Sequence, residues 1–261
     1  KTLIALAVAA SAAVSGSAMA WEPNGTGGSV ALSGTVDVLQ PTTPWEVQVG
    51  NGQNNLDVQI PLGESKAVIP LSNLTNGIPV LSIRTKSDQP FLGHANITPQ
   101  ISYGGAVDLN SFKDSRTVLT LNVNDESGAK IGTLTTTFTA VSEVSQAAVA
   151  DANIRSKFNI YADTQGQAFY GGLPKSVDKI SQDSWYIAKL FDEENVKNYN
   201  DQNANPVKPG NHVFFSDSQF KYSGFYAAGI LNNAEISITL DHPAASNIKW
   251  NASLPVTVSY Q

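Results

Sequence analysis

Short runs in which apolar and polar residues alternate are the feature that most constrains the fold of this 261-residue chain. The clearest run is Trp45–Val49, which ends at a Gly-Asn-Gly turn cluster at residues 50–52. Alternation with a period of two predicts β-strands, because successive side chains of a strand point to opposite faces. Runs of the same kind cover residues 56–60, 67–71, 80–84, 117–123, 133–138, 225–231, 234–240 and 253–260. Many short strands separated by Gly, Pro and Asn predict a mainly β fold, either a sandwich or a barrel.

The pattern changes between residues 141 and 200. Val144, Ala148 and Val149 are spaced as on one face of a helix. A second set with this spacing, with Ser181 as a candidate N-cap, is Ile180, Ile187, Leu190 and Phe191. We therefore expect two short helices inserted into the β fold. Residues 198–211 are rich in Asn, Asp, Gln and Pro, which predicts a loop.

The first twenty residues have the features of a signal peptide. A small-apolar run at residues 3–14 is followed by Ala18-Met19-Ala20, an A-x-A cleavage pattern. A membrane span is the competing interpretation, but the run is short for crossing a bilayer. We therefore expect export and removal of residues 1–20. The chain has no cysteine, so an exported form must be stabilised by packing and strand pairing instead of disulfides.

A strand pattern directly follows the predicted cleavage site. Residues 28–39 place Val30, Leu32, Val36 and Val38 on alternate positions, with Gly34 between them. At a free terminus no neighbouring strand is forced on this segment, and we predict that it completes the sheet of another copy of the chain. The chain also ends in a strand pattern, whose alternate apolar residues are Leu254, Val256, Val258 and Tyr260.

Signatures of catalysis and of metal binding are absent from the sequence. His94, His212 and His242 have no metal-ligand spacing, and no serine-hydrolase elbow or phosphate loop occurs. Residues 201–205 open like a calcium loop, but Pro206 stands where the glycine belongs, and His212 where the bidentate glutamate belongs. We predict no catalytic residue, no metal and no cofactor. The net charge of −6 argues against a nucleic-acid partner.

Aromatic and polar residues are mixed in the inserted segment, as in sugar-binding sites. Aromatic faces contact the C–H patches of sugars, while amides and carboxylates replace the water lost by the hydroxyls. The candidate glycan-binding residues are Tyr161, Asp163, Gln165, Gln167, Phe169, Tyr170 and Trp185. The alternative is that Phe169 and Trp185 belong to the core, because large aromatic side chains are mostly buried.

Four segments of the chain resemble a known family. They are G-S-V-A-L-S-G-T-V at residues 28–36, P-W-E-V-Q-V-G at 44–50, A-F-Y-G-G-L at 168–173, and the ending at 226–260. Together, and in this order, they are similar to the FaeG-like fimbrial subunits of enterotoxigenic bacteria. The resemblance covers essentially all of the chain after the predicted signal peptide.

The resemblance implies a chaperone-usher pilin with an incomplete immunoglobulin-like sandwich, completed by a donor strand. Its implied parts are a signal peptide (1–20), a donor-strand extension (21–39) and a pilin domain (40–261) with an insert at about 142–211. Its implied partners are a periplasmic chaperone, an outer-membrane usher and neighbouring fimbrial subunits, with export through the periplasm to a fimbrium on the cell surface.

The resemblance also gives roles to the two ends of the chain and to the insert. The C-terminal strand ending at Tyr260 is similar to the strand that the chaperone recognises, although many pilins carry glycine where this chain has Ile248. Some members bind host-cell glycans through the insert, and others are minor, non-adhesive subunits. A secreted β-sandwich glycan hydrolase is a third alternative, which no motif supports.

Overall fold

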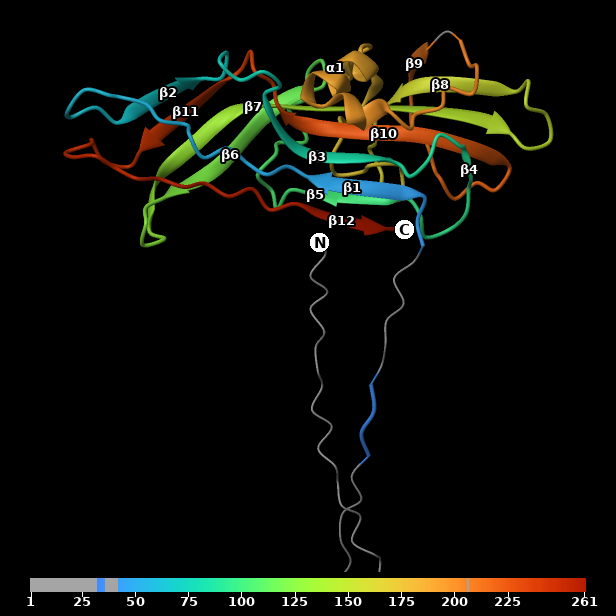
Figure 1. The fold of residues 1–261 in the computed structure, drawn as a ribbon, viewed down its shortest axis with the longest axis horizontal. Coiled ribbons are helices and arrows are strands. Elements are labelled where there is room, and N and C mark those ends of the chain that lie inside the picture. Colours follow the sequence, from blue (N-terminus) through green and yellow to red (C-terminus); the bar gives the residue numbers. More distant parts are fainter. Residues whose placement is uncertain (1–31, 36–41, 206) are drawn as a thin grey trace, which may run out of the picture. The chain divides into compact units, whose positions relative to one another are not determined.

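The computed structural model describes residues 32–35, 42–205 and 207–261 (Figure 1). The chain divides into an N-terminal unit, Lys1–Gln40, and a main unit, Pro41–Gln261. In the N-terminal unit, residues 32–35 have no regular secondary structure, and the Leu32 side chain is exposed. The predicted signal peptide and most of the predicted donor strand, including Val30, Val36 and Val38, lie outside the described residues.

The described part of the main unit is built from twelve strands and one α-helix. The strands are β1 Trp45–Val49, β2 Lys66–Pro70, β3 Ile78–Thr85, β4 Phe91–Leu92, β5 Pro99–Ser102, β6 Arg116–Asn124, β7 Lys130–Ala148, β8 Arg155–Ile160, β9 Val207–Asn211, β10 Phe220–Ile230, β11 Glu235–Leu240 and β12 Thr257–Tyr260. The helix is α1 Ser184–Phe191, and two short 3₁₀ turns lie at Val177–Lys179 and Glu193–Val196. The prediction of a mainly β fold is confirmed.

Ten strands form one sheet around the long strands β7 and β10. Its main order is β1-β3-β10-β7-β11-β2, with β6 and β8 also paired to β7, and β4 to β10. All pairs are antiparallel except β8 with β9. The first half of β7 pairs with β6 and β11, and its second half with β10 and β8. Strands β5 and β12 form a separate two-stranded sheet.

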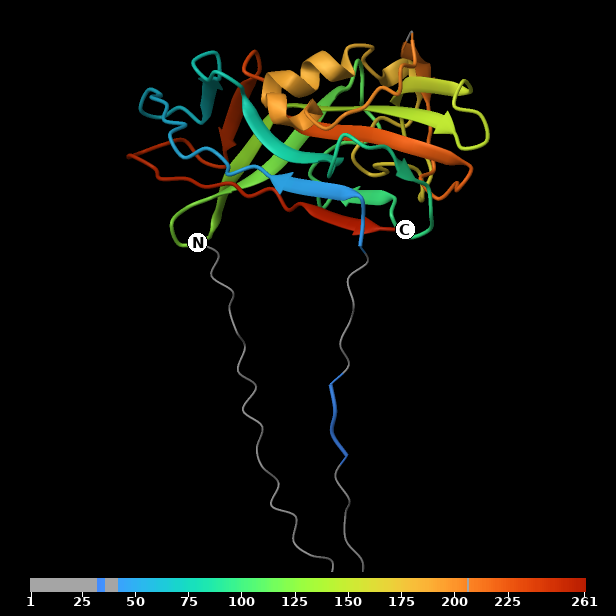
Figure 2. The ribbon, with the colours of Figure 1, turned by 45° about the vertical axis from the view of Figure 1, so that its right-hand side comes forward.

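The second half of β7 is buried on both faces, which explains why its sequence was misread as a helix. On one face Ala140 and Val144 join the main core, and on the other Val141 packs with Phe191 of α1. Both views show α1 over β10, on the side away from β5 and β12 (Figures 1 and 2). A strand covered on both faces loses its alternation of polar and apolar residues. The prediction of a helix at residues 144–149 is therefore wrong.

The second predicted helix is confirmed as α1, with a later start. Its N-cap position is Asp183, and Ser181 instead accepts a hydrogen bond from the Asp183 backbone N–H at 3.3 Å. The polar run 198–211 was predicted to be all loop but ends in β9. The predicted strand at 56–60 is irregular, and that at 253–260 is a strand only over β12. Among the described residues, no helix is long and apolar enough to cross a membrane.

The A-F-Y-G-G-L motif at residues 168–173 contacts both β10 of the main sheet and β5. Phe169 has a backbone φ of 60° and stacks on Tyr226 of β10 with a centroid distance of 5.5 Å. The backbone of Ile101 donates to the Tyr170 carbonyl at 2.8 Å. Gly171 has a φ of 83°, and a Cβ there would overlap the Ile101 carbonyl oxygen. Only glycine fits this approach, so the motif is a structural element of the core.

Candidate functional site

An open groove of about 1260 Å³ runs between two segments that are not strands. One wall is formed by residues 50–62, which follow β1, and the other by residues 244–256, which precede β12. The floor is apolar and comes from β3, β6, β7, β10 and β11. Its side chains are Ile78, Leu119, Leu121, Leu134, Ile230, Ile236, Ile238 and Leu240.

The walls of this groove have backbone groups without backbone partners. Within the described residues, the backbone of residues 51–60 makes no hydrogen bond to another backbone group. In the opposite wall, residues 245–256 make only the reciprocal pair between Asn251 and Asn124, at 2.9 Å in each direction. Exposed N–H and C=O groups along an extended segment are a template for pairing with an added strand.

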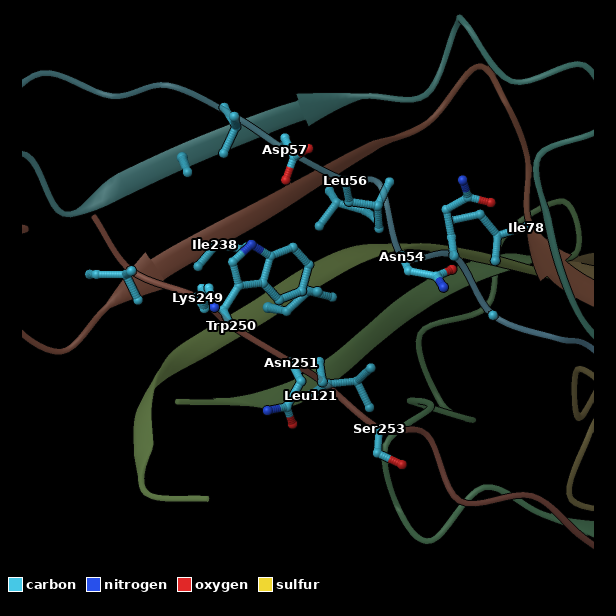
Figure 3. A pocket seen from close by; sticks show the side chains of 18 of the residues that line it. Asn54, Leu56, Asp57, Ile78, Leu121, Ile238, Lys249, Trp250, Asn251 and Ser253 are labelled. Carbon is cyan, nitrogen blue, oxygen red and sulfur yellow. The ribbon is translucent and has the colours of Figure 1, made fainter. Parts of the chain in front are cut away.

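Apolar side chains from both walls reach into the groove. Leu56 and Trp250 project into the space from opposite segments, above the floor residues Leu121 and Ile238 (Figure 3). Ile248 also lines the groove and is 42% exposed. A large apolar surface that is open to solvent is typical of interaction sites.

The C-terminal candidates form the continuation of one groove wall. Leu254 and Val256 line the groove, while Val258 and Tyr260 lie opposite Ile101 and Pro99 in the β5–β12 pair. All four are half-buried, and the residues between them are exposed, so the predicted alternation is present along this segment. The outcome is one apolar edge that runs from the groove to the end of the chain.

The glycan-binding candidates are separated by the fold. Gln167 and Phe169 are buried, and Tyr170 is half-buried beside β5. Trp185 lies on α1 and is 43% exposed. Tyr161, Asp163 and Gln165 lie at the surface near each other in sequence. The sequence motif had therefore combined core residues with surface residues.

The surface candidates extend into a row of aromatic rings that sequence spacing did not reveal. Tyr161 meets His212 edge-on at a centroid distance of 5.7 Å, and His212 meets the exposed Phe214 at 5.8 Å. The Tyr161 hydroxyl lies 3.3 Å from His212 Nδ1. Hydrogen bonding with Gln167 lowers the pKa of the adjacent Asp163, which stays ionised. We call Tyr161, His212 and Phe214 the aromatic row.

The arrangement of titratable side chains does not indicate a metal or catalytic centre. The three histidines are all exposed. In the segment that opens like a calcium loop, Asp201 accepts hydrogen bonds from the Asn203 backbone N–H and from Lys157. Over residues 42–205 and 207–261, no group of three or more His, Asp or Glu side chains is arranged to hold a metal ion.

The groove residues that sequence reasoning missed as a site are the floor side chains and Trp250. All floor residues except Ile78 lie in runs whose alternation predicted strands. Alternation shows which face of a strand is apolar and gives no information on what covers it. The opening of the groove was visible only in three dimensions.

Comparison with known proteins gives matches over the full length. A family model described as "Fimbrial, major and minor subunit" matches residues 1–261. K88 fimbrial protein AC of Escherichia coli is 29% identical over 286 residues, covering 100% of this chain and 99% of the relative. F41 fimbrial protein of Escherichia coli is 25% identical over 298 residues, with the same coverage of each chain.

Proposed function

The chain belongs to the family of major and minor fimbrial subunits, and we propose that it polymerises by donor-strand exchange through the apolar groove. As a fimbrial subunit it is a structural protein and not an enzyme. In the proposed assembly, residues 21–39 of one subunit enter the groove of the next. The observation that carries the proposal is an apolar floor bordered by two walls whose backbone groups lack backbone partners.

The N-terminal extension has the pattern that such a groove requires. An inserted strand presents alternate side chains to the floor, and its backbone supplies hydrogen bonds to the walls. Val30, Leu32, Val36 and Val38 are the side chains that would face the floor. Burial of four such side chains contributes about 6–12 kcal/mol before the cost of ordering the segment, at about 1.5–3 kcal/mol each.

The same groove gives a reason for the proposed partners. An apolar groove with open edges is prone to aggregation before a second subunit arrives. A periplasmic chaperone that covers the groove, with the C-terminal strand Leu254–Tyr260 as part of its contact, would prevent this. The proposed path is export of the precursor, chaperone binding, and incorporation at an outer-membrane usher into a surface fimbrium. In the fibre, the donor strand would complete an immunoglobulin-like sandwich.

Deletion of the extension tests the polymerisation proposal. A chain that lacks residues 21–39 should be secreted but form no fibre, because it has no donor segment to insert into the groove of the next subunit. A synthetic peptide of residues 28–39, added to the purified deleted chain, should raise its melting temperature in a concentration-dependent way. A peptide with serine at the positions of Val36 and Val38 is the matched control. Fibres of normal length built from the deleted subunit alone would overturn the proposal.

Gly34 gives a finer test of how the strand fits. A small residue within an apolar alternation fits a narrow point in the acceptor groove, where Leu56 and Trp250 approach from the two walls. We expect Gly34→Leu to block assembly and leave secretion intact, as seen by electron microscopy and by immunoblotting of the periplasm. Gly27→Leu, which precedes the strand, is the control that should still assemble. Normal fibres from Gly34→Leu would reject this register.

Adhesion to host-cell glycans is a second candidate function, which the aromatic row favours. Tyr161, His212 and Phe214 form exposed edge-on contacts next to the ionised Asp163. Aromatic faces beside a carboxylate acceptor suit the C–H patches and hydroxyls of a sugar. The alternative is a minor, non-adhesive subunit.

A glycan array distinguishes the two subunit types. The assembled fimbria, or the subunit complemented by a donor peptide, should bind a subset of host glycans, and Phe214→Ala should abolish that binding. Tyr186→Ala removes a ring on α1 that is more exposed than Phe214, and it should leave glycan binding unchanged. Absence of binding to every glycan would assign the chain to the non-adhesive subunits.

A further inference from the structure

A second hollow, of about 500 Å³, lies on the opposite side of the sheet from the groove floor, beside α1. It is bordered by β7, β8, α1 and the loop 197–205, which we call the insert loop. Its lining residues are Asp88, Glu143, Lys157, Trp185, Tyr199, Asn200, Asp201 and Val207. None of these residues contributes to the groove or to the aromatic row, so the hollow is independent of the proposed polymerisation.

The walls of this hollow are fixed by hydrogen bonds from the insert loop. Ser145 donates to the Asn200 carbonyl at 2.6 Å, and the Asn200 backbone N–H donates to the Ser223 hydroxyl at 3.0 Å. The Asn200 side-chain amide donates to the Asp88 carbonyl at 2.8 Å. These bonds tie the loop to β7, to β10 and to the connection between β3 and β4, so the hollow is held open by a preorganised wall.

Glu143 is a buried acceptor that the protein only partly satisfies. It is 4% exposed and lines the hollow. Tyr199 donates to its Oε1 at 2.8 Å, and no described residue donates a hydrogen bond to its Oε2. Burial raises the pKa of Glu143, because the charged carboxylate has lost water that the protein does not replace. Oε2 is therefore the acceptor that a donor entering the hollow can use.

The charges in the hollow are unbalanced in favour of a cation. Asp88, Glu143 and Asp201 supply three carboxylates, against the single ammonium of Lys157. That ammonium is already paired with Asp201 at 3.2 Å and makes no ion pair with Glu143. A carboxylate in a confined site of low dielectric gains more from an incoming cation than from a neutral donor.

Trp185 adds a surface that attracts the same kind of group. Its ring is 43% exposed and borders the hollow. The ammonium of Lys189 lies 4.7 Å from the ring centroid, and it is held there together with Glu193 at 3.4 Å. The position of Lys189 shows that an ammonium is accommodated against this indole, which is the strongest aromatic partner for cations.

From these contacts we propose that the hollow is a binding site for a primary ammonium group carried by a small organic molecule. The ammonium donates to Glu143 Oε2, its charge offsets the excess of carboxylates, and its carbon chain packs on Trp185. Anionic ligands are excluded by Asp88 and Asp201 at the rim. A neutral sugar supplies donors but no charge, and it is therefore a weaker ligand than an amine of the same size.

Titration of the full chain with matched small probes tests this assignment. The probes are n-butylamine against n-butanol, and glucosamine against glucose, so that each pair differs chiefly in the ammonium group. Binding is followed by the indole N–H signal of Trp185 in ¹H–¹⁵N spectra, which Trp185→Phe identifies by its loss. We expect n-butylamine and glucosamine to shift this signal saturably, and n-butanol and glucose to leave it unchanged.

Two variants separate the roles of charge and of stacking. Glu143→Gln keeps the shape and an acceptor for Tyr199 but removes the charge, and it should weaken n-butylamine binding by about tenfold or more. Trp185→Ala, at an exposed position, should weaken it by less, and backbone signals near the hollow report binding in that variant. Lys249→Met, in the groove wall, is the control that should bind normally.

Two results would overturn the proposal. Equal binding of glucose and glucosamine would make the hollow a neutral sugar site, and unchanged n-butylamine binding in Glu143→Gln would remove the buried carboxylate from it. Absence of any saturable shift with either amine, in a protein whose spectrum is that of the folded chain, would show that the hollow binds no ammonium.

Discussion

The sheet around β7 has two apolar surfaces, and the chain covers one of them but leaves the other open. On the outer side, Val141 of β7 and Phe225 and Ala227 of β10 are buried under Ile187 and Phe191 of α1. On the inner side, Leu121, Leu134 and Ile238 form the floor of the groove, and no described segment crosses it. The two surfaces are alike in chemistry and differ in what the chain supplies to cover them.

The difference extends to the polar groups at the edges of each surface. In the insert loop, the backbone groups of Asn198 and Asn200 are hydrogen-bonded to the hydroxyls of Thr85, Ser145 and Ser223. In the groove walls, as far as the structure describes them, residues 51–60 have no backbone partner, and residues 245–256 have only the pair between Asn251 and Asn124. A surface that is covered within one chain stabilises the free subunit. An open surface contributes burial free energy only when a second chain covers it. Substitutions on the groove floor should therefore impair assembly, whereas substitutions under α1 should destabilise the subunit whether or not it is assembled.

The largest effect is expected from a charge placed on the groove floor. Leu121 is only partly buried in the free subunit, but a donor strand would cover it completely. Leu121→Asp should abolish fibre formation, because an unpaired buried carboxylate costs several kcal/mol. Val118→Asp, on the opposite face of the same strand, is the matched control, since Val118 is exposed. Fibres from Leu121→Asp, with a folded subunit by circular dichroism, would contradict the role of the groove.

Truncation on the covered surface should instead destabilise the free subunit. Phe191 is 1% exposed at the centre of the α1 contact, and Phe191→Ala should lower the free energy of unfolding by about 3–5 kcal/mol. The measurement is denaturant unfolding with and without the donor peptide, and the loss should be the same in both. Tyr186→Ala, on the exposed side of α1, should cost much less. A loss that appeared only with the peptide bound would mean that α1 belongs to the assembly contact.

The two surfaces also differ in how far sequence reasoning reached them. Strands with one solvent face, such as β2 and β6, kept their alternation and were predicted within one or two residues. The second half of β7 lost that alternation because α1 covers its outer face, and it was predicted as a helix. The helix itself was predicted from the spacing of Ile187, Leu190 and Phe191, of which Ile187 and Phe191 are buried and Leu190 is exposed. Whether a strand shows polar–apolar alternation in its sequence therefore depends on whether one or both of its faces are covered in the fold.

The sites show a related limit. The apolar residues of the floor and of β12 were found from alternation, but the space between them depends on where residues 50–62 and 244–256 lie. The residues Phe169 and Gln167 were assigned to glycan binding by their type, and the fold places them in the interior. His212 meets Tyr161 across 51 positions of sequence, which no local motif records, and Phe214 joins the row through His212.

A smaller, pH-dependent effect is expected at Glu143, beneath the insert loop. Burial raises the pKa of this carboxyl in the folded protein, while the Tyr199 hydroxyl and Lys157 oppose the shift. Below its unfolded-state pKa the carboxyl is protonated in both states and carries no penalty. As the pH rises through the folded-state pKa, the folded protein must ionise a buried group, so the free energy of unfolding decreases.

Replacement of this carboxyl should remove that part of the pH dependence. Glu143→Gln should flatten the fall in stability above the usual carboxylate range, with an effect of the order of 1 kcal/mol. The measurement is urea unfolding at a series of pH values. Asp151→Asn, an exposed carboxylate in the β7–β8 turn, is the control that should keep the wild-type profile. An unchanged profile in Glu143→Gln would mean that water reaches the carboxylate in the folded state.

The smallest effect is expected from the ion pair at the groove wall. Lys249 Nζ lies 3.0 Å from Glu126 Oε1, but both side chains are mostly exposed, and solvent screens such pairs. The wall is also tied to the end of β6 by the backbone pair between Asn251 and Asn124. If that backbone pair positions the wall, Lys249→Met should change the free energy of unfolding by no more than about 1 kcal/mol and leave fibre assembly intact.

Salt provides the control for this last prediction. The wild-type chain and Lys249→Met should lose the same stability when the ionic strength is raised, because an exposed pair contributes little that salt can remove. Asn251→Pro, which removes the backbone N–H that donates to Asn124, should instead loosen the wall and impair assembly. The opposite order, with assembly lost in Lys249→Met and kept in Asn251→Pro, would mean that side-chain charge holds the groove open. The position of the groove wall would then depend on electrostatic interactions, whereas the covered surface depends on apolar packing against α1.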